Sequence, residues 1–365
     1  MIIRRLFLSN YRNYKKLELV LKPGINVISG DNAQGKTNLL EAVYYLGTLR
    51  SFRVRSEAEL VAWEQDWAGI AADFIRPSGE ESQLEVRWAR GLDGRWERRV
   101  KRGGAVLKSL VEFLGEVPLT LFIPQDLALV QGAPEGRRRY LDVLLCKSSP
   151  QYLRTLVRYQ QVMRQRNEWL KRYDRRCSIR ELEVWDEQLT VLAAYLVEKR
   201  QETVRCLNGI INEVFSALAD TAVNLQMFYR ASLSGTAEEM LGSVQKRRGD
   251  ELQRRLTLSG PHRDDIVMQM EGRLLKQCAS QGQQRSAALA MRLAEAVLMG
   301  RINANPAIIL LDDCFSELDR KRCRRLFDYL GALGQVIITS VNRLEYKGSA
   351  SVAEYIVNEG SIIAV

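Results

Sequence analysis

The sequence predicts an α/β protein in which one nucleotide-fold domain is built from both ends of the chain and a helical arm is inserted between them. Two observations support this prediction. An apolar strand at residues 25–29 leads into a glycine-rich loop at 30–37 and then into a helix-like segment. The middle of the chain spaces its apolar residues three and four apart, as helices do, and strand-like sequence returns towards the C-terminus. We expect a head made of residues 1–125 and 251–365 and an arm made of residues 126–250.

The composition is that of a globular chain with a basic bias. The 365 residues include 54 Lys and Arg, 44 Asp and Glu and a single His, for a formal net charge of +10. The chain is long enough to bury a sizeable core, and no stretch reaches the roughly 18 to 20 apolar residues that a membrane span needs. The charged start MIIRRLFLSNYRNYKK does not fit a secretory signal. We therefore expect a soluble protein of the cytoplasm with no membrane partner.

Cysteine and histidine usage argues against several kinds of chemistry. The six Cys are scattered, without a CxxC pair or a His at metal-ligand spacing, so we expect reduced thiols that fill apolar space. With one His in the chain, a Ser-His-Asp triad or a His-rich metal site is disfavoured. We interpret that residue, His262 in GPHRDD, as a hydrogen-bonded turn residue near the helix that follows, rather than as a proton donor.

Shorter patterns outline the elements of the head. Residues 2–8 and 17–21 are typical of strands, and residues 68–102 predict an antiparallel meander that turns at 92–94. Towards the C-terminus we expect a helix, a buried strand, an αβ step and a hairpin, at about 283–299, 307–311, 320–340 and 355–365.

The arm carries the excess charge. Residues 137–180 hold 13 Lys and Arg and 3 Asp and Glu, and this excess of ten equals the net charge of the whole chain. Two mainly apolar stripes, at 153–170 and 182–196, step by three and four and predict an antiparallel helical hairpin joined at 173–180. The second helix is expected to continue to about Leu218.

The glycine-rich loop matches the phosphate-binding pattern G-x-x-x-x-G-K-[ST]. Its glycines let backbone N–H groups wrap a phosphate, and the N-terminus of the following helix adds positive potential. Lys36 would reach the β- and γ-phosphates of ATP, and Thr37 would supply a hydroxyl ligand to Mg²⁺. The alternative is an ordinary Gly-rich turn, but the flanking strand and helix favour a nucleotide site. The residues expected to bind nucleotide here are Gly30, Asp31, Asn32, Ala33, Gln34, Gly35, Lys36, Thr37 and Asn38.

Two adjacent acids end the apolar run at 307–311. Asp312 would hold Mg²⁺, directly or through water, and Asp313 would polarise the attacking water. The candidate catalytic residues are therefore Asp312, Asp313 and Lys36. The alternative is a pair of acids at a strand end that nearby Arg side chains neutralise.

A third segment, SQGQ at 280–283, precedes the helix-like sequence SAALAMRLAEAVLM. Ser280 and Gly282 at this helix entrance form a hydroxyl and backbone-amide nest suited to a γ-phosphate. The segment SELD at 316–319 follows the paired acids. Each tetrapeptide alone also fits a helix cap, but their order behind a phosphate loop favours a nucleotide role.

This order of motifs resembles that of the SMC/ABC-type ATPases, and more narrowly the chain resembles the RecF family of bacterial DNA-repair proteins over essentially its full length. The segments that carry the resemblance are LSNYRNY (8–14), GDNAQGKTNLLEAVYYL (30–46), RRRYLD (137–142), QRNEWLK (165–171), GPHRDD (260–265), SQGQQRS (280–286) and LLDDCFSELD (310–319). The resemblance implies an ABC/SMC-type ATPase head, with a phosphate-loop sheet and an antiparallel β subdomain, and an inserted helical arm.

The resemblance also implies a mechanism. Two copies would meet head to tail, with each ATP between the phosphate loop of one copy and the signature serine, Ser280, of the other. The residues added to the nucleotide site on this ground are Arg12, Asn13, Ser280, Gly282, Gln283 and Asp319, the last at the dimer seam. The family binds duplex DNA near single-strand gaps, acts in DNA repair, replication and the SOS response, and works with RecR and RecO to help RecA load. This implies a weak, DNA-stimulated ATPase associated with the nucleoid.

The chain departs from the wider ABC pattern at two places. The second acid is Asp313 rather than Glu, one methylene shorter, which predicts slow turnover. Where ABC proteins usually carry a switch His, this chain has Thr339-Ser340-Val341, which puts that γ-phosphate contact in doubt. Gln125, near the expected boundary between head and arm, is a candidate for the Q-loop glutamine.

Basic side chains suggest where DNA would bind. Two faces of the predicted arm helix and the strand meander supply the candidates: Arg154, Arg158, Arg164, Lys171, Arg175, Arg87, Arg95 and Arg99. No recognition helix, zinc knuckle or RNA-binding aromatic pattern is present, so DNA would be read by its backbone and shape. The alternative is that these are ordinary solvated or ion-paired arginines.

Two other classes of function fit parts of the sequence. A P-loop kinase of a small molecule would explain Lys36 but neither SQGQ, SELD nor the basic hairpin. A nucleotide-sensing scaffold that mainly binds proteins, with incidental DNA contact, is the other. Salt-dependent binding to gapped duplex, with and without ATP, separates these hypotheses.

Overall fold

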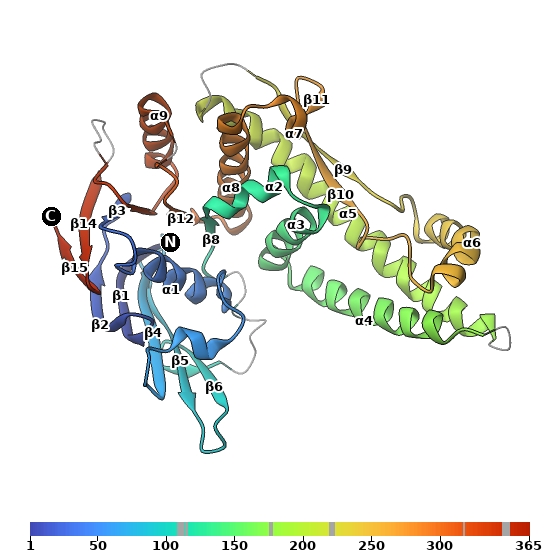
Figure 1. The fold of residues 1–365 in the computed structure, drawn as a ribbon, viewed down its shortest axis with the longest axis horizontal. Coiled ribbons are helices and arrows are strands. Elements are labelled where there is room, and N and C mark those ends of the chain that lie inside the picture. The colour runs from blue at the N-terminus through green and yellow to red at the C-terminus, as the bar shows by residue number, and fades with distance from the viewer. Residues whose placement is uncertain (108–112, 114–115, 175–177, 219–222, 317, 345–350) are drawn as a thin grey trace. The chain divides into compact units, whose positions relative to one another are not determined.

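The structure is a computed structural model that describes residues 1–107, 113, 116–174, 178–218, 223–316, 318–344 and 351–365. The chain forms two compact units (Figure 1). The head unit comprises Met1–Leu127, Glu213–Ala222 and Ser280–Val365, and the arm unit comprises Ala128–Asn212 and Val223–Ala279. In the described part of the chain, no helix combines the length and apolar character needed to cross a membrane.

The head unit contains a six-stranded, mostly parallel sheet. Its strand order is β15-β14-β3-β13-β12-β8, and within it only β15 pairs antiparallel with its neighbour. Strand β3 (Ile25–Ser29) is buried at every residue, because it has a parallel neighbour on each side and its sequence, INVIS, is mostly apolar. The other strands are β8 (Leu119–Phe122), β12 (Ile308–Asp312), β13 (Val336–Ser340), β14 (Val352–Asn358) and β15 (Ser361–Ala364).

A second, antiparallel sheet completes the head unit, with the order β2-β1-β4-β5-β6-β7. Its strands are β1 (Ile2–Tyr11), β2 (Tyr14–Val20), β4 (Trp67–Ile75), β5 (Glu81–Arg90), β6 (Trp96–Arg102) and β7 (Ala105–Val106). The predicted meander is therefore confirmed. One apolar core joins the two sheets through α1, where Tyr45 packs edge-on against Trp88 of β5.

The head helices begin where the sequence signals predict. Helix α1 (Lys36–Thr48) starts directly after the glycine-rich loop and contacts β12, β13 and β4. Helix α8 (Gln281–Asn303) packs against β8, and α9 (Arg320–Gly331) precedes β13. Two 3₁₀ turns are η1 (Glu57–Leu60) and η2 (Pro124–Leu127). The predicted fold class, a phosphate-loop sheet with an antiparallel β subdomain and an inserted helical arm, is confirmed.

The arm unit is mainly helical and has a small sheet of order β11-β10-β9. Its elements are α2 (Ala128–Gln131), α3 (Pro134–Ser148), α4 (Pro150–Arg172), α5 (Ile179–Leu218), β9 (Leu225–Arg230), α6 (Ala237–Arg254), β10 (Asp265–Met270), β11 (Arg273–Leu274) and α7 (Leu275–Cys278). The predicted hairpin is formed by α4 and α5, which bury Tyr159, Leu189 and Leu196 in one core. By its contacts, the last turn of α5 belongs to the head unit.

The boundary between the units differs from the one predicted at residue 251. Residues 251–279 belong to the arm unit, because β10 pairs antiparallel with β9, for example Ile266 with Tyr229. The end of α6 is also held inside the arm through Glu251. The sequence pattern near 265–270 predicts a strand but cannot identify the strand with which it pairs, and for this reason the predicted boundary differs from the one in the structure.

A buried network of charged and polar groups holds the arm together. Arg166 of α4 is fully buried and donates hydrogen bonds to Asp186 of α5 (2.8 Å), Glu251 of α6 (2.5 Å) and the hydroxyl of Thr257 (2.8 Å). Because the two carboxylates face a guanidinium with several donors, the buried charges are paired and hydrogen-bonded. Arg248 adds a second cation beside Asp186 at 3.0 Å.

A second network links the motifs RRRYLD and GPHRDD. Arg137 binds Asp265 through two hydrogen bonds of 2.8 and 3.0 Å, and Arg138 donates to the carbonyl of Asp264 at 2.8 Å. Asp142 in turn accepts from Arg200 of α5 at 2.8 Å. These residues, far apart in the sequence, thus have structural partners within the arm.

His262 is held by hydrogen bonds to α4 and to the loop after α6. Its Nδ1 lies 2.7 Å from the hydroxyl of Tyr159 and its Nε2 lies 3.2 Å from the carbonyl oxygen of Thr257. Because a carbonyl can only accept, Nε2 carries the proton and Nδ1 accepts from Tyr159. Burial lowers the pKa of His262 to about 4, and the positive charges of Arg263 and Arg138 act in the same direction. Its predicted role as a hydrogen-bonded turn residue agrees with these contacts, and its partners lie within the arm unit.

We predict that acid destabilises the arm through His262. The depressed pKa means that this residue favours folding fully above pH 6.5 and that the contribution is lost as the pH falls towards 4, by on the order of 3 kcal/mol. Since the chain has one His, its imidazole proton resonances report this group alone. The measurement is an NMR titration, with urea unfolding of wild type and His262→Gln between pH 7 and 4. A midpoint near 6.5, or equal loss of stability in both proteins, would contradict the prediction.

Candidate nucleotide-binding site

The candidate site lies where parallel strands of the central sheet end side by side. The glycine-rich loop follows β3, Asp312 ends β12, and Thr339 lies opposite Asp312 near the end of β13. The hydroxyl of Thr37, at the start of α1, lies 3.1 and 3.2 Å from the two carboxylate oxygens of Asp312. The structure thus brings together residues predicted from two motifs that are 275 positions apart.

Glycine is required at both ends of the loop. Gly30 and Gly35 have φ angles of +151° and +111°, which L-residues rarely adopt. A Cβ on Gly30 would lie 2.5 Å from the carbonyl oxygen of Val357, and one on Gly35 would lie 2.5 Å from the side chain of Asn13. Between them, Ala33 also has a positive φ, of 65°. The loop is therefore a tight backbone cradle rather than an extended turn.

Lys36 is folded over this cradle. Its ammonium donates to the carbonyl oxygens of Gly30 and Asp31, at 2.6 Å each. Burial lowers the pKa of Lys36, while the negative charges of Asp313, Asp312 and Asp31 oppose that shift. A cation surrounded by main-chain acceptors and carboxylates can exchange those acceptors for phosphate oxygens.

The two acids have different environments. Burial raises the pKa of Asp312, and the hydrogen bonds from Thr339 (2.6 Å) and Thr37 lower it again. Asp313 has a positive φ of 45°, and its N–H donates to the carbonyl of Thr339 at 3.1 Å. Within the described residues, its Oδ1 is buried and has no hydrogen-bond partner. A buried carboxylate oxygen without a donor is unusual and fits a group that binds a ligand.

Arg12 and Asn13, predicted to lie near the nucleotide, both support the loop. Arg12 donates two hydrogen bonds, of 2.9 and 2.8 Å, to the buried carboxylate of Glu41 in α1. Asn13 donates to the carbonyl of Gln34 at 3.0 Å and accepts from Asn38 at 2.8 Å. The positions agree with the expectation, and a contact of either residue with nucleotide stays a prediction.

Ser280 and Gln283 form a reciprocal cap at the start of α8. The hydroxyl of Ser280 accepts from the N–H of Gln283 at 3.3 Å, and the side chain of Gln283 accepts from the N–H of Ser280 at 2.9 Å. Helix α8 packs against β8 and β12, whereas the loop follows β3. Among the described residues, the hydrogen bonds of Ser280 stay within the first turn of α8 and do not reach the phosphate loop.

Asp319 caps α9 and adjoins the signature. Its carboxylate accepts from the N–H of Arg322 at 2.9 Å. A Cβ on Gly282 would lie 2.8 Å from the guanidinium of Arg322. A side chain at Gly282 would displace Arg322. The signature and the SELD turn are thus neighbours.

Arg53 is a candidate site residue that the sequence analysis missed. Its guanidinium donates to the side-chain oxygen of Asn38 at 2.6 Å, and its charge helps to lower the pKa of Asp312. It lies in an irregular segment between α1 and η1, so no periodicity or motif marks it. Gln125, the Q-loop candidate, is exposed in η2 and its role stays a prediction.

The predicted DNA contacts of the strand meander are paired with acids. Arg87 lies 2.5 Å from Glu85, Arg95 lies 3.7 Å from Asp93, and Arg99 lies 3.6 Å from Glu97. The three side chains are exposed, but each has a carboxylate two positions earlier in the sequence. The alternative of ion-paired arginines therefore fits this group well, because their charge is locally balanced.

The predicted DNA contacts of α4 lie on the surface of the arm unit. Arg154, Arg158, Arg164 and Lys171 are all exposed. Arg158 donates to Gln188 at 3.1 Å, and Lys171 pairs with Glu168 at 3.0 Å. Arg175 lies outside the described residues.

The fold and the site define an ATPase head of the SMC/ABC type. The family model of the RecF/RecN/SMC N-terminal domain matches residues 2–362. The DNA replication and repair protein RecF of Chloroflexus aurantiacus is 36% identical, with both chains covered completely, and that of Halalkalibacterium halodurans is 35% identical over 99% of each chain. The chain belongs to the RecF family, as the motif order predicts.

Solved structures agree with this assignment. A structure of the recombination mediator protein RecF-ATPrS in the RecFOR pathway matches with a TM-score of 0.89 and 27% identity, covering 100% of this chain and 98% of that one. An SmcHead bound to the C-winged helix domain of ScpA matches with a TM-score of 0.59 and 16% identity, over 100% of this chain and 98% of that one. The second match shows a shared fold alone.

We predict that Thr339→Val shifts the acid limit of Mg·ATP binding to higher pH. Removal of the Thr339 hydroxyl takes away a hydrogen bond that lowers the pKa of Asp312, so Asp312 would be protonated at a higher pH than in wild type. The measurement is Mg·ATP affinity as a function of pH. Thr120→Val in β8 is the matched control, because this buried hydroxyl has no hydrogen-bond partner among the described residues. Equal pH profiles for the two variants would contradict the assignment.

Proposed function

We propose that this chain is an ATP-dependent DNA-binding protein of recombinational repair and replication. ATP would join two copies head to tail on duplex DNA near single-strand gaps, and slow hydrolysis would release them. The observation that carries the proposal is the contact between Thr37 and Asp312 beside the Lys36 cradle, because this pairing of groups serves nucleotide triphosphates. Two solved relatives carry ATP or ATPrS in their names, which supports the choice of nucleotide.

The oxygen donors at the site fit Mg²⁺. A hydroxyl and a carboxylate, from Thr37 and Asp312, are hard ligands already within hydrogen-bond distance of each other. These two residues would hold the ion, which would neutralise charge on the β- and γ-phosphates. The buried, unpaired Oδ1 of Asp313 lies next in sequence and fits a role in polarising the attacking water.

The phosphate loop would hold the triphosphate mainly through backbone N–H groups. The positive φ angles of Gly30, Ala33 and Gly35 turn successive peptides, and α1 begins directly after them. Lys36 would exchange the carbonyl oxygens of Gly30 and Asp31 for phosphate oxygens. Since those two hydrogen bonds are replaced rather than lost, the ammonium stays paired throughout.

Slow hydrolysis follows from the second acid. Asp313 has a side chain one methylene shorter than the Glu of the wider ABC pattern. The hydrogen bond from its N–H to Thr339 holds its backbone, and from the same backbone position the shorter side chain extends less far than that of Glu. The protein would therefore act as a weak ATPase, stimulated by DNA, whose ATP-bound dimer is long-lived.

The position of Ser280 supports a dimer. Among the described residues, the hydrogen bonds of Ser280 stay within the first turn of α8 and none reaches the phosphate loop, so a triphosphate on the loop of one copy would be enclosed by the signature of another copy. Ser280, Gly282 and Gln283 would then face the γ-phosphate in trans, with Asp319 at the seam.

The cellular role is proposed from the family. The name of one solved relative places that protein in the RecFOR pathway. By analogy, this chain would work with RecR and RecO and would indirectly help RecA to load at gapped DNA. It would act in the cytoplasm, associated with the nucleoid.

We predict that Lys36→Ala and Ser280→Arg are each inactive but complement each other. Loss of the Lys36 ammonium should weaken ATP binding by roughly 10- to 100-fold, and Arg at position 280 should prevent that signature from contacting the γ-phosphate of the site that it faces. In a mixed dimer, one site keeps both native residues if Ser280 acts in trans, so an equal mixture should regain roughly a quarter of the wild-type ATPase rate. Sedimentation with ATP would follow dimer formation. A mixture as inactive as either parent would place Ser280 in cis.

We predict that Asp313→Asn keeps ATP binding and stabilises the dimer. The amide preserves size but cannot accept a proton, so the hydrolysis rate should fall by a factor on the order of 10². ATP affinity and the dimer fraction with ATP are compared with wild type by titration and sedimentation. Turnover at or above the wild-type rate would exclude Asp313 as the group that polarises water.

A further inference from the structure

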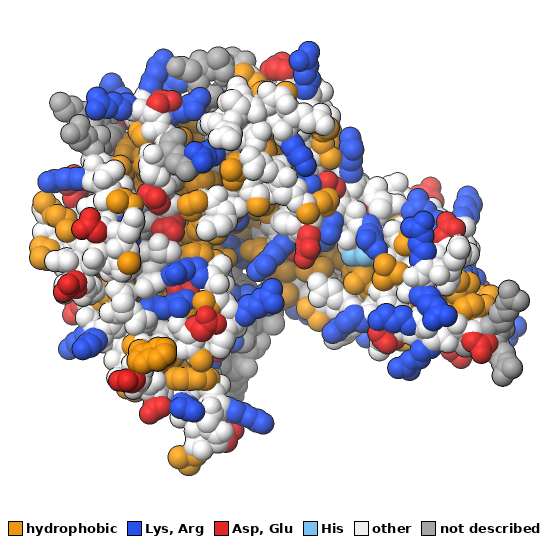
Figure 2. All heavy atoms as spheres, in the orientation of Figure 1, with side chains coloured by type: hydrophobic (Ala, Val, Ile, Leu, Met, Phe, Trp, Pro, Cys, Tyr) orange, Lys and Arg blue, Asp and Glu red, His pale blue; other side chains and the backbone are white. Residues whose placement is uncertain are grey.

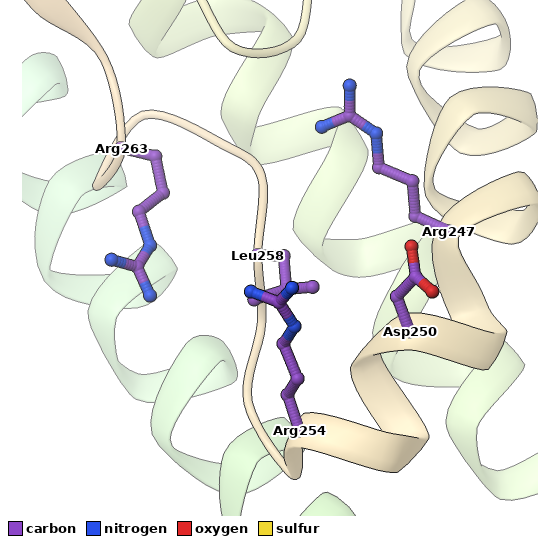
Figure 3. Close-up of a pocket in the computed structure, with 5 residues that line it drawn as sticks. All are labelled: Arg247, Asp250, Arg254, Leu258 and Arg263. Carbon is purple, nitrogen blue, oxygen red and sulfur yellow. The ribbon is translucent and has the colours of Figure 1, made fainter.

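A shallow, positively charged hollow lies on the arm unit, and none of its lining residues belongs to the nucleotide site. It has a volume of about 420 Å³ and is lined by Arg247, Asp250, Arg254, Leu258 and Arg263 (Figure 3). The first three residues belong to α6 and the last two to the loop that follows it. All four charged side chains are exposed to solvent.

The hollow is held in place by the opposite face of α6. Met240 and Val244 of this helix are buried in the apolar core of the arm. Glu251 accepts from Arg166 and also, at 2.8 Å, from the N–H of Leu258, so one buried carboxylate joins the helix to the loop. Arg263 follows His262, which is fixed by Tyr159. The surface arginines thus project from a backbone that is anchored on both sides.

The three arginines of the hollow have no internal partner in the described part of the chain. No hydrogen bond or ion pair of the Arg247, Arg254 or Arg263 side chains is formed there, although the Asp250 carboxylate stands between two of them on α6. This distinguishes the hollow from the strand meander, where Arg87 and its neighbours each have a carboxylate within 4 Å. Unpaired guanidinium groups around a hollow create a local positive potential that attracts anions.

The arrangement fits an extended polyanion better than a single small anion. Arg247 and Arg254 are seven residues apart on one face of α6, which corresponds to about 10 Å along the helix axis. Phosphates of one DNA strand advance about 3.4 Å per step along the duplex axis, so an α6 that lies parallel to this axis would span roughly three steps. Figure 3 shows the three guanidinium groups spread around the hollow rather than converging on one point. Asp250 would repel an anion placed midway between the two helix arginines.

The surroundings extend the positive surface. Arg255, which caps α6, donates to the carbonyl of Lys171 at 3.2 Å, so the end of α6 adjoins one of the predicted DNA contacts of α4. Figure 2 shows Lys and Arg side chains gathered over the region where Figure 1 places α4 and α6.

We propose that this hollow binds the sugar-phosphate backbone of duplex DNA, with Arg247 and Arg254 each contacting a phosphate of one strand and Arg263 contacting the same backbone from the loop. The inference rests on the proposed function, since it names the surface with which the protein would bind DNA. It adds three residues on α6 and its loop that the sequence analysis did not select. Contacts of this kind position a duplex and carry no base specificity.

The test is DNA binding by full-length protein with a non-hydrolysable ATP analogue. The variant Arg247→Gln/Arg254→Gln is compared with the control Arg205→Gln/Arg273→Gln, which removes two exposed charges from the same unit. Fluorescence anisotropy with a labelled gapped duplex gives the affinity over a range of salt. The hollow variant should bind about tenfold more weakly, and the slope of log affinity against log salt should fall by about 1.8. The control should change the affinity by less than about twofold and leave the slope unchanged.

The outcomes separate the hollow from the proposed function. If wild type shows no salt-dependent binding to gapped duplex, the proposed function itself is wrong. If wild type binds and the hollow variant matches the control, the hollow is not a DNA contact and the proposed function stands. Inorganic phosphate at millimolar concentration is the second probe. Thermal stabilisation of wild type but not of the hollow variant, with equal DNA binding by both, would make this a small-anion site and overturn the proposal.

A substitution that is expected to strengthen DNA binding shows whether misfolding accounts for the result. Asp250→Asn removes the one negative charge that lines the hollow, so it should strengthen DNA binding by about twofold to fivefold. Glu187→Gln, an exposed acid on α5, is its control. A gain in affinity cannot result from loss of structure. Weaker binding by Asp250→Asn, or the same gain in both variants, would contradict a phosphate contact at this place.

Discussion

Parallel hydrogen bonding of β3, β13 and β12 is the constraint on which the nucleotide site depends. In a parallel sheet the carboxyl ends of neighbouring strands meet at one edge, and the register pairs Ser29 with Ser340 and Asp312 with Thr339. The glycine-rich loop, the paired acids and the Thr339 hydroxyl therefore lie close together in space although they are far apart in the sequence. A shift of register by one residue would turn the Asp312 side chain to the other face of the sheet and separate it from Thr37.

The arm depends on a different principle, the pairing of charges away from water. Arg137, Lys147 and Arg166 lie in the strongly basic stretch 137–180 but are buried, so this stretch contributes less positive surface than its composition suggests. Arg166 connects α4, α5 and α6 through their carboxylates. Buried ion pairs of this kind add little net stability, yet removal of one partner leaves an isolated charge and is strongly destabilising. They therefore favour one particular packing of the three helices.

Most of the fold could be predicted from sequence because its signals are local. The strand, loop and helix of a phosphate loop can be predicted from a segment of about twenty residues. The hairpin of α4 and α5 can be predicted from the spacing of apolar residues. Partners far apart in the chain carry no such signal. The pairing of β10 with β9, which moves the domain boundary from 251 to 280, and the approach of Arg53 to Asn38 both depend on tertiary structure. The acids that pair with Arg87 and Arg99 lie two positions earlier in the chain, but the sequence alone does not show that they form ion pairs. The sequence does not single out the three arginines of the hollow, because their significance is that no side chain among the described residues pairs with them, which is a property of the folded surface.

The central position of β3 has a consequence for biosynthesis. This strand emerges among the first thirty residues, but both of its sheet neighbours, β13 and β14, lie beyond residue 335. At a translation rate of about 5–20 residues per second, an apolar strand would wait roughly 15–60 s on the ribosome for its partners. The arm can complete its own core during that interval, whereas the ATPase sheet closes only near the end of synthesis. Nascent chains of this protein should therefore depend on chaperones that shield the N-terminal strands.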